Sequence, residues 1–489
     1  MTSSTPILRP SHNVWQTARA DRVSVIVDAA DYFTAAREAM LLAQCRIMLI
    51  GWDFDTRIKL SRNRRPRGEP ATLGEFILWL ADTRPDLEIK IIKWDVGALK
   101  MLFRGSSLVT AARWAMHERI QFKLDGAHPV GASHHQKIVV VDDCFAVCGG
   151  IDMTSDRWDT PEHIDDDPRR KRPGGKLYGP WHDVTMLVDG GVARALGKLG
   201  RMRWVAAGGE PLDECTIRDG IWPKSVEPMF RNVEVGIART RGEYQDSPEV
   251  REIETLFDDL IAGAKHFIYI ENQYFASRRV AEAIATRMAE PDPPEVILVT
   301  AANADGWLEQ QAMDTARARL VDAIQRVDHR SRFRIYHPVT AAGEPIYVHA
   351  KLMIVDDQIL RVGSANMNNR SLGLDSECDL VLDNTHDYPE GVNATISALR
   401  MRLMAEHLGV DVARIASLAV AGESTIAIIE ALRGNARSLV PFELPELTVT
   451  QSFVADNEVL DPEAAGALFE PFAKRRLFRR KRLQKPTTA

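Results

Sequence analysis

The sequence predicts an α/β protein made of two similar α/β/α sandwich domains, with a functional site at their interface and a C-terminal helical, basic tail. Three observations predict this. The motif H-x-K-x4-D begins at His135 and recurs at His349, 214 residues later (349 − 135). Helix-like and strand-like segments alternate before each copy. The 489 residues are also enough for two hydrophobic cores. A period this long excludes a solenoid and indicates two domains facing each other.

The elements before the two motifs match in order. An apolar run at 22–27 opens the first half. In each half, an amphipathic helix then leads to an apolar strand, and a second strand follows, as a mainly parallel or mixed sheet covered by helices requires. The helix and two strands are expected at 31–43, 47–51 and 88–92, and again at 250–264, 267–270 and 295–299.

The residues after each motif also repeat. Two small residues stand 14 positions after the histidine, Gly149-Gly150 in the first half and Gly363-Ser364 in the second. Each half continues with a short polar side chain, an arginine, and an acid before a β-like run. These residues are Asp152, Arg157 and Asp183 in the first half, and Asn366, Arg370 and Glu377 in the second. The acid comes 20 positions later in the first half, which predicts a polar loop insertion over about 159–179.

The motif residues indicate chemistry on a phosphodiester. A histidine and a lysine two apart on a strand point to the same face, so two copies can aim four groups at one small anion. Histidine can attack phosphorus or move protons near neutral pH, and lysine supplies positive charge for phosphate oxygens. The sequence therefore predicts one phosphodiester-cleaving site built by both halves.

These motifs resemble the paired HKD motifs of the phospholipase D superfamily, over about residues 23–408. The flanking segments are similar, more narrowly, to bacterial, eukaryote-like phospholipase D enzymes. These segments are 149–163, 180–184, 270–275 and 363–371. We expect an N-terminal extension over 1–22, a first repeat over 23–215, a second repeat over 216–425 and a C-terminal appendage over 426–489.

The resemblance implies a catalytic set from both motifs. One histidine would form a phosphohistidine and the other would protonate the leaving alcohol. Similarity to the family favours His135 as the nucleophile, whereas the local sequence does not distinguish the two. The catalytic set is His135, Lys137, Asp142, His349, Lys351 and Asp356, in which the two aspartates have a support role.

Four further polar residues complete the predicted site. We expect Asp183 and Glu377 to orient the histidines by accepting from one ring nitrogen; each could also be a strand-end surface acid. Asn366 and Asp152 are expected to bind phosphate together with the two lysines, although an acid after Gly-Gly is also ordinary turn chemistry. Five aromatic residues are candidates for the pocket lining: Trp52, Trp94, Trp181, Tyr274 and Tyr347.

We expect no cofactor and no metal at the catalytic site, because two lysines and one imidazolium carry the required charge. The best candidates for a metal cluster are His134 and His135, and His163 beside the acidic run at 165–167. That run is expected to be solvated surface, with calcium binding as a weak alternative.

Composition describes an ordinary soluble protein with 45% hydrophobic and 27% charged residues. No run of eighteen apolar residues predicts a membrane span, and the N-terminus lacks the apolar core of a signal peptide. Five cysteines, an odd number, favour a reducing cytoplasm over a disulfide framework. Secretion by a route that needs no N-terminal signal stays open.

The charge is uneven. The net charge is −6, yet residues 474–485 carry eight basic side chains and no acidic one. Such a tail can bind anionic lipid headgroups, so we expect peripheral membrane association; a solvated tail or nucleic-acid contact are the alternatives. The acidic remainder of the chain argues against a general nucleic-acid partner. One chain carries both motifs, so a monomer suffices for catalysis.

The leading hypothesis is hydrolysis of glycerophospholipids to phosphatidic acid and a headgroup alcohol, with transphosphatidylation when another alcohol resolves the intermediate. Three alternatives are weighed against it. They are a cardiolipin synthase-like phosphatidyltransferase, an HKD-type nuclease, and a non-catalytic membrane-binding module.

Overall fold

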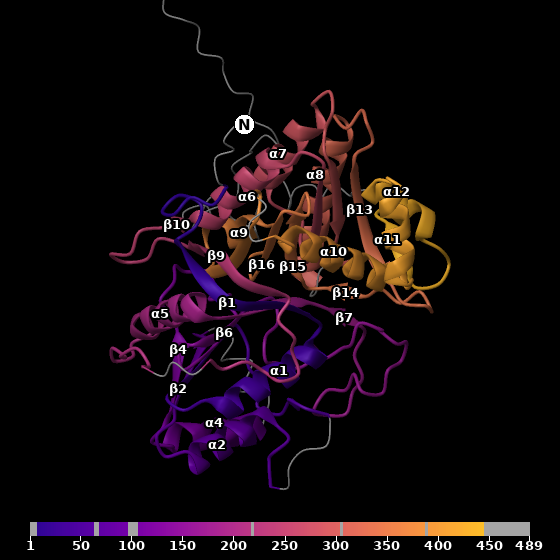
Figure 1. Ribbon diagram of the computed structural model, residues 1–489. Coiled ribbons are helices and arrows are strands. Elements are labelled where there is room, and N and C mark those ends of the chain that lie inside the picture. Colours follow the sequence, from indigo (N-terminus) through magenta and orange to yellow (C-terminus); the bar gives the residue numbers. More distant parts are fainter. Residues whose placement is uncertain are drawn as a thin grey trace, which may run out of the picture.

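The computed structural model describes residues 7–62, 68–95, 106–216, 220–303, 307–386 and 390–444. The basic segment 474–485, and with it most of the predicted C-terminal appendage, lies outside the described residues. A central sheet of 16 strands runs through the molecule, and helices cover both of its faces (Figure 1).

The strands of the two halves are arranged in the same order. The first half contains β1 (Gln16–Val27), β2 (Arg46–Gly51), β3 (Glu88–Trp94), β4 (Ile120–Asp125), β5 (Ile138–Val141), β6 (Phe145–Gly149) and β8 (Val184–Asp189). The second contains β9 (Phe230–Arg241), β11 (Phe267–Asn272), β12 (Glu295–Val299), β13 (Phe333–Val339), β15 (Lys351–Val355), β16 (Ile359–Gly363), β17 (Glu377–Asp383) and the edge strand β18 (Ser438–Pro441). Outward from the centre the orders are β1-β8-β6-β5-β2-β3-β4 and β9-β17-β16-β15-β11-β12-β13-β18. The halves join through the antiparallel pair β1 and β9, so the repeat forms one mixed sheet.

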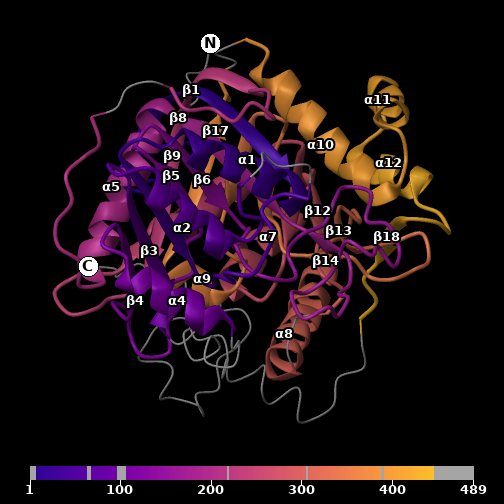
Figure 2. The same ribbon diagram turned by 90° about the horizontal axis from the view of Figure 1, so that it is seen from below.

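Three hydrophobic cores hold the helices on this sheet. On one face a single core extends through both halves and includes α5 (Gly190–Ala206) and α10 (Val392–Leu408). On the other face each half has its own core, beneath α1 (Ala29–Leu42) and α2 (Leu73–Thr83) in the first and beneath α6 (Glu252–Gly263) and α7 (Arg278–Met288) in the second. The remaining helices and short strands are α4 (Ser106–Met116), α8 (Trp307–Gln325), α9 (Asn369–Gly373), α11 (Val412–Val420), α12 (Thr425–Leu432), β7 (Trp181–His182), β10 (Val250–Arg251) and β14 (Tyr347–Val348). Figure 2 shows α10, α11 and α12 grouped beside β13 and β18.

The predicted α/β class and repeat are confirmed, and the predicted strands and helices differ from the observed ones mainly at their ends. The polar segment 159–179 contains no helix and no named strand, as expected for a loop insertion. The predicted division at 215 and 425 stays a prediction. Among the described residues, no helix is both long and apolar enough to span a bilayer.

The aspartate that ends each motif holds the entry of a neighbouring strand. The Asp142 carboxylate accepts backbone N–H groups of Gln44, Cys45 and Arg46 at 2.7–2.8 Å. The Asp356 carboxylate does the same for residues 265–267, also at 2.7–2.8 Å. Each carboxylate thereby satisfies backbone donors where the chain passes from helix to strand. Both aspartates are structural.

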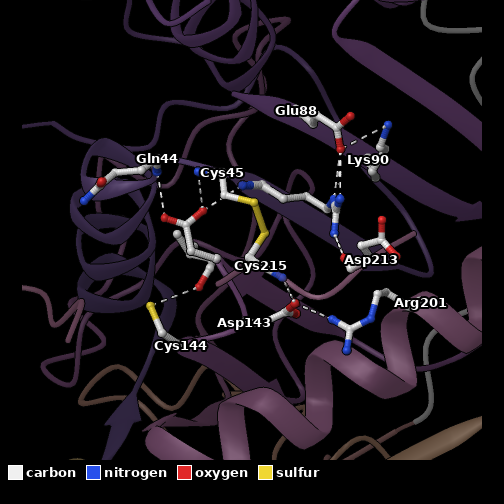
Figure 3. The surroundings of a disulfide bond; sticks show 12 residues. Gln44, Cys45, Glu88, Lys90, Asp143, Cys144, Arg201, Asp213 and Cys215 are labelled. Atoms are coloured by element: carbon white, nitrogen blue, oxygen red, sulfur yellow. Dashed lines mark hydrogen bonds and ion pairs between the residues drawn. A yellow bond between two sulfur atoms is a disulfide. The ribbon is translucent and has the colours of Figure 1, made fainter. Parts of the chain in front are cut away.

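The prediction of no disulfide was wrong. Cys45 and Cys215 are joined by a disulfide with a Cα–Cα distance of 6.2 Å, which ties the start of β2 to the segment after α5 (Figure 3). Asp142 and Asp143 accept the backbone N–H groups of the two cysteines. Cys144, Cys148 and Cys378 are not disulfide-bonded, so an odd number of cysteines still included one pair. Sequence could not show this pair, because 170 residues separate its members.

Candidate active site

Both halves line one cavity of about 630 Å³. His135 and His349 both reach it, although they lie on different halves of the sheet. Its mouth is aromatic: Trp52 stacks on Trp94 with ring centroids 5.7 Å apart. All five aromatic residues considered from the sequence line it, namely Trp52, Trp94, Trp181, Tyr274 and Tyr347.

Each motif histidine is held by an acid from the opposite half. The Nδ1 atom of His135 hydrogen-bonds both carboxylate oxygens of Glu377, at 2.9 and 3.0 Å. The Nδ1 atom of His349 lies 2.7 Å from Oδ2 of Asp183. Both acids are fully buried. With Nδ1 engaged, Nε2 is the ring nitrogen available for chemistry.

Backbone hydrogen bonds also hold each histidine beside the acid of the other half. The N–H of His135 donates to the carbonyl of Ser376, which directly precedes Glu377. In the same way, the N–H of His349 donates to the carbonyl of His182, which precedes Asp183. The short parallel pair β7 and β14 extends the second contact. Each histidine is therefore positioned by main-chain bonds between the halves as well as by its acid.

The two motif lysines lie beneath the cavity in unequal surroundings. Lys137 Nζ donates to the carbonyl of His135 at 2.8 Å and lies 3.4 Å from Oδ2 of Asp152. Lys351 Nζ donates to the carbonyl of His349 and to Oε1 of Gln273, the latter at 3.1 Å. One ammonium thus faces a carboxylate and the other a neutral amide.

Burial shapes the protonation of the site. Desolvation, and then the charges of Lys137 and Lys351, hold the pKa of His135 well below its usual range. Desolvation, Lys351 and Arg157 have the same effect on the pKa of His349. These shifts favour the neutral imidazoles near pH 7. Burial also lowers the pKa of Lys351 to about 7.

Burial acts on the two acids in the opposite direction. It raises the pKa of Glu377 to about 7 and that of Asp183 to about 6, because desolvation penalises the carboxylate. Hydroxyl groups of Ser364 and Ser371 donate to Glu377, each at 2.6 Å, and partly offset this effect. At Asp183 the backbone N–H of Val184 donates to the carboxylate and likewise lowers its pKa.

The small residues after each strand explain how an aspartate and a glutamate perform one task. A Cβ atom on Gly150 would lie 2.1 Å from Oδ1 of Asp183, so only glycine leaves room for that carboxylate. Ser364 occupies the equivalent position in the second half and donates to Glu377 instead. The roles of Ser364, Ser371 and Gln273 were missed from the sequence. The change from Gly-Gly to Gly-Ser was the available signal for the first of them.

The structure brings most predicted site residues together, with two exceptions. Asn366 and Asp152 line the cavity beside the histidines. Asp142 and Asp356 do not, because each stands at the far end of its strand and binds backbone N–H groups there. These contacts agree with the support role expected of the two aspartates, and their place in the catalytic set stays a prediction.

Among the described residues, neither grouping named from the sequence, His134 with His135 or His163 with the run at 165–167, forms a cluster of metal ligands. His134 is buried 3.3 Å from Asp125, away from His135's cavity-facing ring, and burial lowers its pKa to about 3. Asp167 pairs with Arg169 at 2.7 Å rather than with His163. His163 instead contacts Asp159, at 2.9 Å.

Comparison with known proteins follows the same division into halves. Residues 39–221 match the family model described as Phospholipase D. Residues 257–397 match the one described as Cardiolipin synthase, PLD-like domain. Together the two matches cover most of both halves of the sheet.

Curated relatives and a solved structure agree with these matches. The chain is 26% identical to Phospholipase D A of Dictyostelium discoideum, over 81% of this chain and 36% of the relative. It is also 26% identical to Phospholipase D1 of Saccharomyces cerevisiae, over 84% of this chain and 30% of that relative. Phosphatidylserine synthase of Haemophilus influenzae Rd KW20 shares the fold, with a TM-score of 0.53 and 14% identity over 78% of this chain and 86% of that one.

The chain spans about a third of the length of these two phospholipase D relatives. The expectation of a bacterial source stays a prediction. With the repeated HKD motifs, the shared cavity and the two family matches, the chain belongs to the phospholipase D superfamily.

Proposed function

We propose that this chain is a phospholipase D-type phosphodiesterase that hydrolyses glycerophospholipids to phosphatidic acid and a free headgroup alcohol. The observation that carries the proposal is the pair of histidines in one cavity, each held at Nδ1 by a buried acid from the other half. That arrangement directs two Nε2 atoms at one bound phosphate, as in-line displacement requires.

In the proposed reaction His135 Nε2 attacks phosphorus, and the bond from phosphorus to the headgroup oxygen breaks. His349 gives its Nε2 proton to the departing alkoxide, which leaves as the alcohol. His349 then takes a proton from water, whose oxygen attacks phosphorus and breaks the P–N bond. Phosphatidic acid is released and both histidines return to their starting state.

Substrate binding explains how His349 acquires its proton. Desolvation and nearby cations hold the pKa of His349 well below its usual range. A bound phosphodiester brings a negative charge that offsets these cations and favours the imidazolium. The acid therefore forms when the substrate arrives.

Positive charge around phosphorus comes from Lys137 and Lys351, with the Asn366 side chain as a neutral donor. Asp152 has a different part from the one expected of it. Its carboxylate accepts the N–H groups of Trp52 and Asp53 and lies 3.4 Å from Lys137 Nζ, so we propose that it positions the lysine. If the Asp152 carboxylate faced the phosphate oxygens, its negative charge would oppose phosphate binding.

Any alcohol that reaches the phosphohistidine can resolve it, so we propose transphosphatidylation as a second outcome. A cardiolipin synthase-like reaction, with another phospholipid as acceptor, is the second candidate function. It is favoured by the family model that matches residues 257–397.

One chain supplies both histidines and both acids, so we propose that the monomer is active. We also propose that residues 474–485 recruit it to anionic membranes. The Cys45–Cys215 disulfide contradicts the cysteine-based argument for a cytoplasmic location.

The test is headgroup release from phosphatidylcholine vesicles in the presence of ethanol, for the wild type and His135→Ala. We expect choline and phosphatidylethanol from the wild type and neither from the variant. His337→Ala, outside the cavity-lining residues, is the matched control and keeps both products. No release from any phospholipid by folded wild type contradicts the proposal. Cardiolipin formation from phosphatidylglycerol without choline release would favour the second candidate.

A further inference from the structure

A second cluster of polar side chains lies behind the active site, buried between the two halves. Asp28, His163 and His182 come from the first half and Glu406 from α10 in the second. Asp28 and His182 have no exposed surface, and His163 is 1% exposed. None of the four lines the catalytic cavity.

We propose that these four residues form a tetrahedral Zn²⁺ site that joins the two halves. The geometry supports this directly. Glu406 Oε1 lies 2.8 Å from His182 Nδ1 and 3.3 Å from His163 Nε2. Oxygens of Asp28 lie 3.5 Å from His182 Nδ1 and 3.7 Å from His163 Nε2. Ligands 2.0–2.1 Å from a tetrahedral zinc ion are about 3.3 Å apart, which falls within this range.

Each histidine is oriented as a zinc ligand would be. His163 engages Asp159 through Nδ1 at 2.9 Å, which leaves Nε2 toward the cluster. His182 engages Glu271 through Nε2 at 2.8 Å, which leaves Nδ1 toward the cluster. Metal-bound histidines usually donate their other N–H to a carboxylate in this way, which fixes the tautomer.

Asp28 provides an independent observation. Its Oδ2 atom has no hydrogen-bond partner among the described residues, although it is buried and faces His163. An unpaired buried carboxylate oxygen is costly, and a metal ion would satisfy it. Asp28 also has φ 67° and ψ 153°, a backbone region that strongly favours glycine, and its side chain does not cap α1. The residue is held in a conformation that presents its carboxylate to the cluster.

The charge and donor types select the ion. Four buried carboxylates meet here, on Asp28, Asp159, Glu271 and Glu406. Basic side chains beside them outside the cluster include Arg170, 3.4 Å from Asp159, and His407, 2.9 Å from Glu271. A divalent cation would reduce this negative excess. Two imidazole nitrogens with two carboxylates suit zinc, whereas calcium and magnesium prefer oxygen ligands. Glu406 also lines a separate cavity of about 740 Å³ that offers a path for the ion.

The site would brace Asp183, the acid that holds His349. Asp28 N–H donates to the carbonyl of Asp183 at 2.8 Å, and Asp183 N–H donates back to Oδ1 of Asp28 at 3.2 Å. His182 immediately precedes Asp183. All four zinc ligands are protein groups, so the role is structural and leaves the proposed reaction at phosphorus unchanged.

The first test is metal content, measured by mass spectrometry on full-length protein made without a polyhistidine tag. The protein is stripped with a chelator, incubated with Zn²⁺ and freed of excess metal. We expect about one zinc per chain in the wild type, and loss of it in Asp28→Asn and His163→Gln. His337→Gln, a histidine outside the cluster, keeps the zinc. A wild type that binds no zinc, or variants that bind as much as the wild type, overturns the proposal.

Two further measurements use protein whose ligands are intact. Co²⁺ added to stripped wild type should give the visible absorption of a tetrahedral site, and Zn²⁺ should raise its melting temperature. Asp159→Asn should weaken zinc binding about 10–100-fold by releasing His163. An octahedral cobalt spectrum, or no change in melting temperature with zinc, would contradict the assignment. None of these readouts depends on lipid hydrolysis.

Discussion

The two halves of the active site have the same layout, but they hold their histidines by different means. In the first half, Gly150 leaves room for the short acid Asp183, which holds His349. In the second, Ser364 and Ser371 donate to the longer acid Glu377, which holds His135. The lysines differ in parallel, because Lys137 faces Asp152 and Lys351 faces Gln273. The repeat thus provides two similar frames whose electrostatics have diverged, as expected if one histidine attacks and the other donates a proton.

The largest expected effect comes from neutralising the acids one at a time. Asp183→Asn and Glu377→Gln should each lower kcat by about 10³–10⁴, because an amide does not stabilise an imidazolium or fix its tautomer. The loss should be smaller for Glu377→Gln, since Ser364 and Ser371 can still orient the amide. Steady-state headgroup release measures both, with circular dichroism to confirm folding. Wild-type turnover in either variant would contradict the assigned pairs.

Substitutions at Gly150 and Ser364 distinguish a loss of space for the acid from a loss of a hydrogen bond to it. Gly150→Ala places a Cβ atom 2.1 Å from Oδ1 of Asp183, which must displace the carboxylate from His349. We expect kcat/KM to fall about 10²-fold, the usual cost of a misplacement near 1 Å. Ser364→Gly removes one hydrogen bond to Glu377 and the contacts of the same hydroxyl with the Cys378 backbone, and it should cost about tenfold or less. Equal losses in the two variants would show that the halves are not specialised in this way.

The lysine environments can be made alike by Gln273→Glu. Burial lowers the pKa of Lys351 to about 7, so the free enzyme loses this charge as pH rises through that value. A carboxylate at position 273 favours the ammonium and should move the alkaline limb of kcat/KM to higher pH, by about one unit. Gln273→Met, which adds no charge, is the control and should not move the limb upward. An unchanged limb in Gln273→Glu would assign the alkaline ionisation to another group.

The smallest effect on activity is expected from substitution of Asp142 or Asp356, which make equivalent contacts in the two halves. Asp142→Asn and Asp356→Asn each weaken three hydrogen bonds to backbone N–H groups. Each should lower the free energy of unfolding by about 1–3 kcal/mol, measured by urea denaturation. Turnover per folded molecule should stay near the wild-type value. A large loss of kcat with unchanged stability would show that these aspartates act in catalysis.

The fold class, the order of the elements and most of the residues named for the site could be predicted from the sequence. The reason is that each of these is recorded locally. Strands and helices follow hydrophobic periodicity, and the two motifs repeat with their flanking residues at nearly constant spacing. The histidines, lysines and acids could therefore be named before their positions were known.

Which acid serves which histidine follows from the packing of the two halves, because Glu377 lies 242 residues from His135 and Asp183 lies 166 residues from His349 in the sequence. The disulfide and the buried cluster around Asp28 arise in the same way. The sequence analysis grouped His163 with the neighbouring acidic run at 165–167. In the structure it contacts Glu406, which lies 243 residues away in the sequence. Packing of the two halves brings such residues together, and no local pattern records that packing.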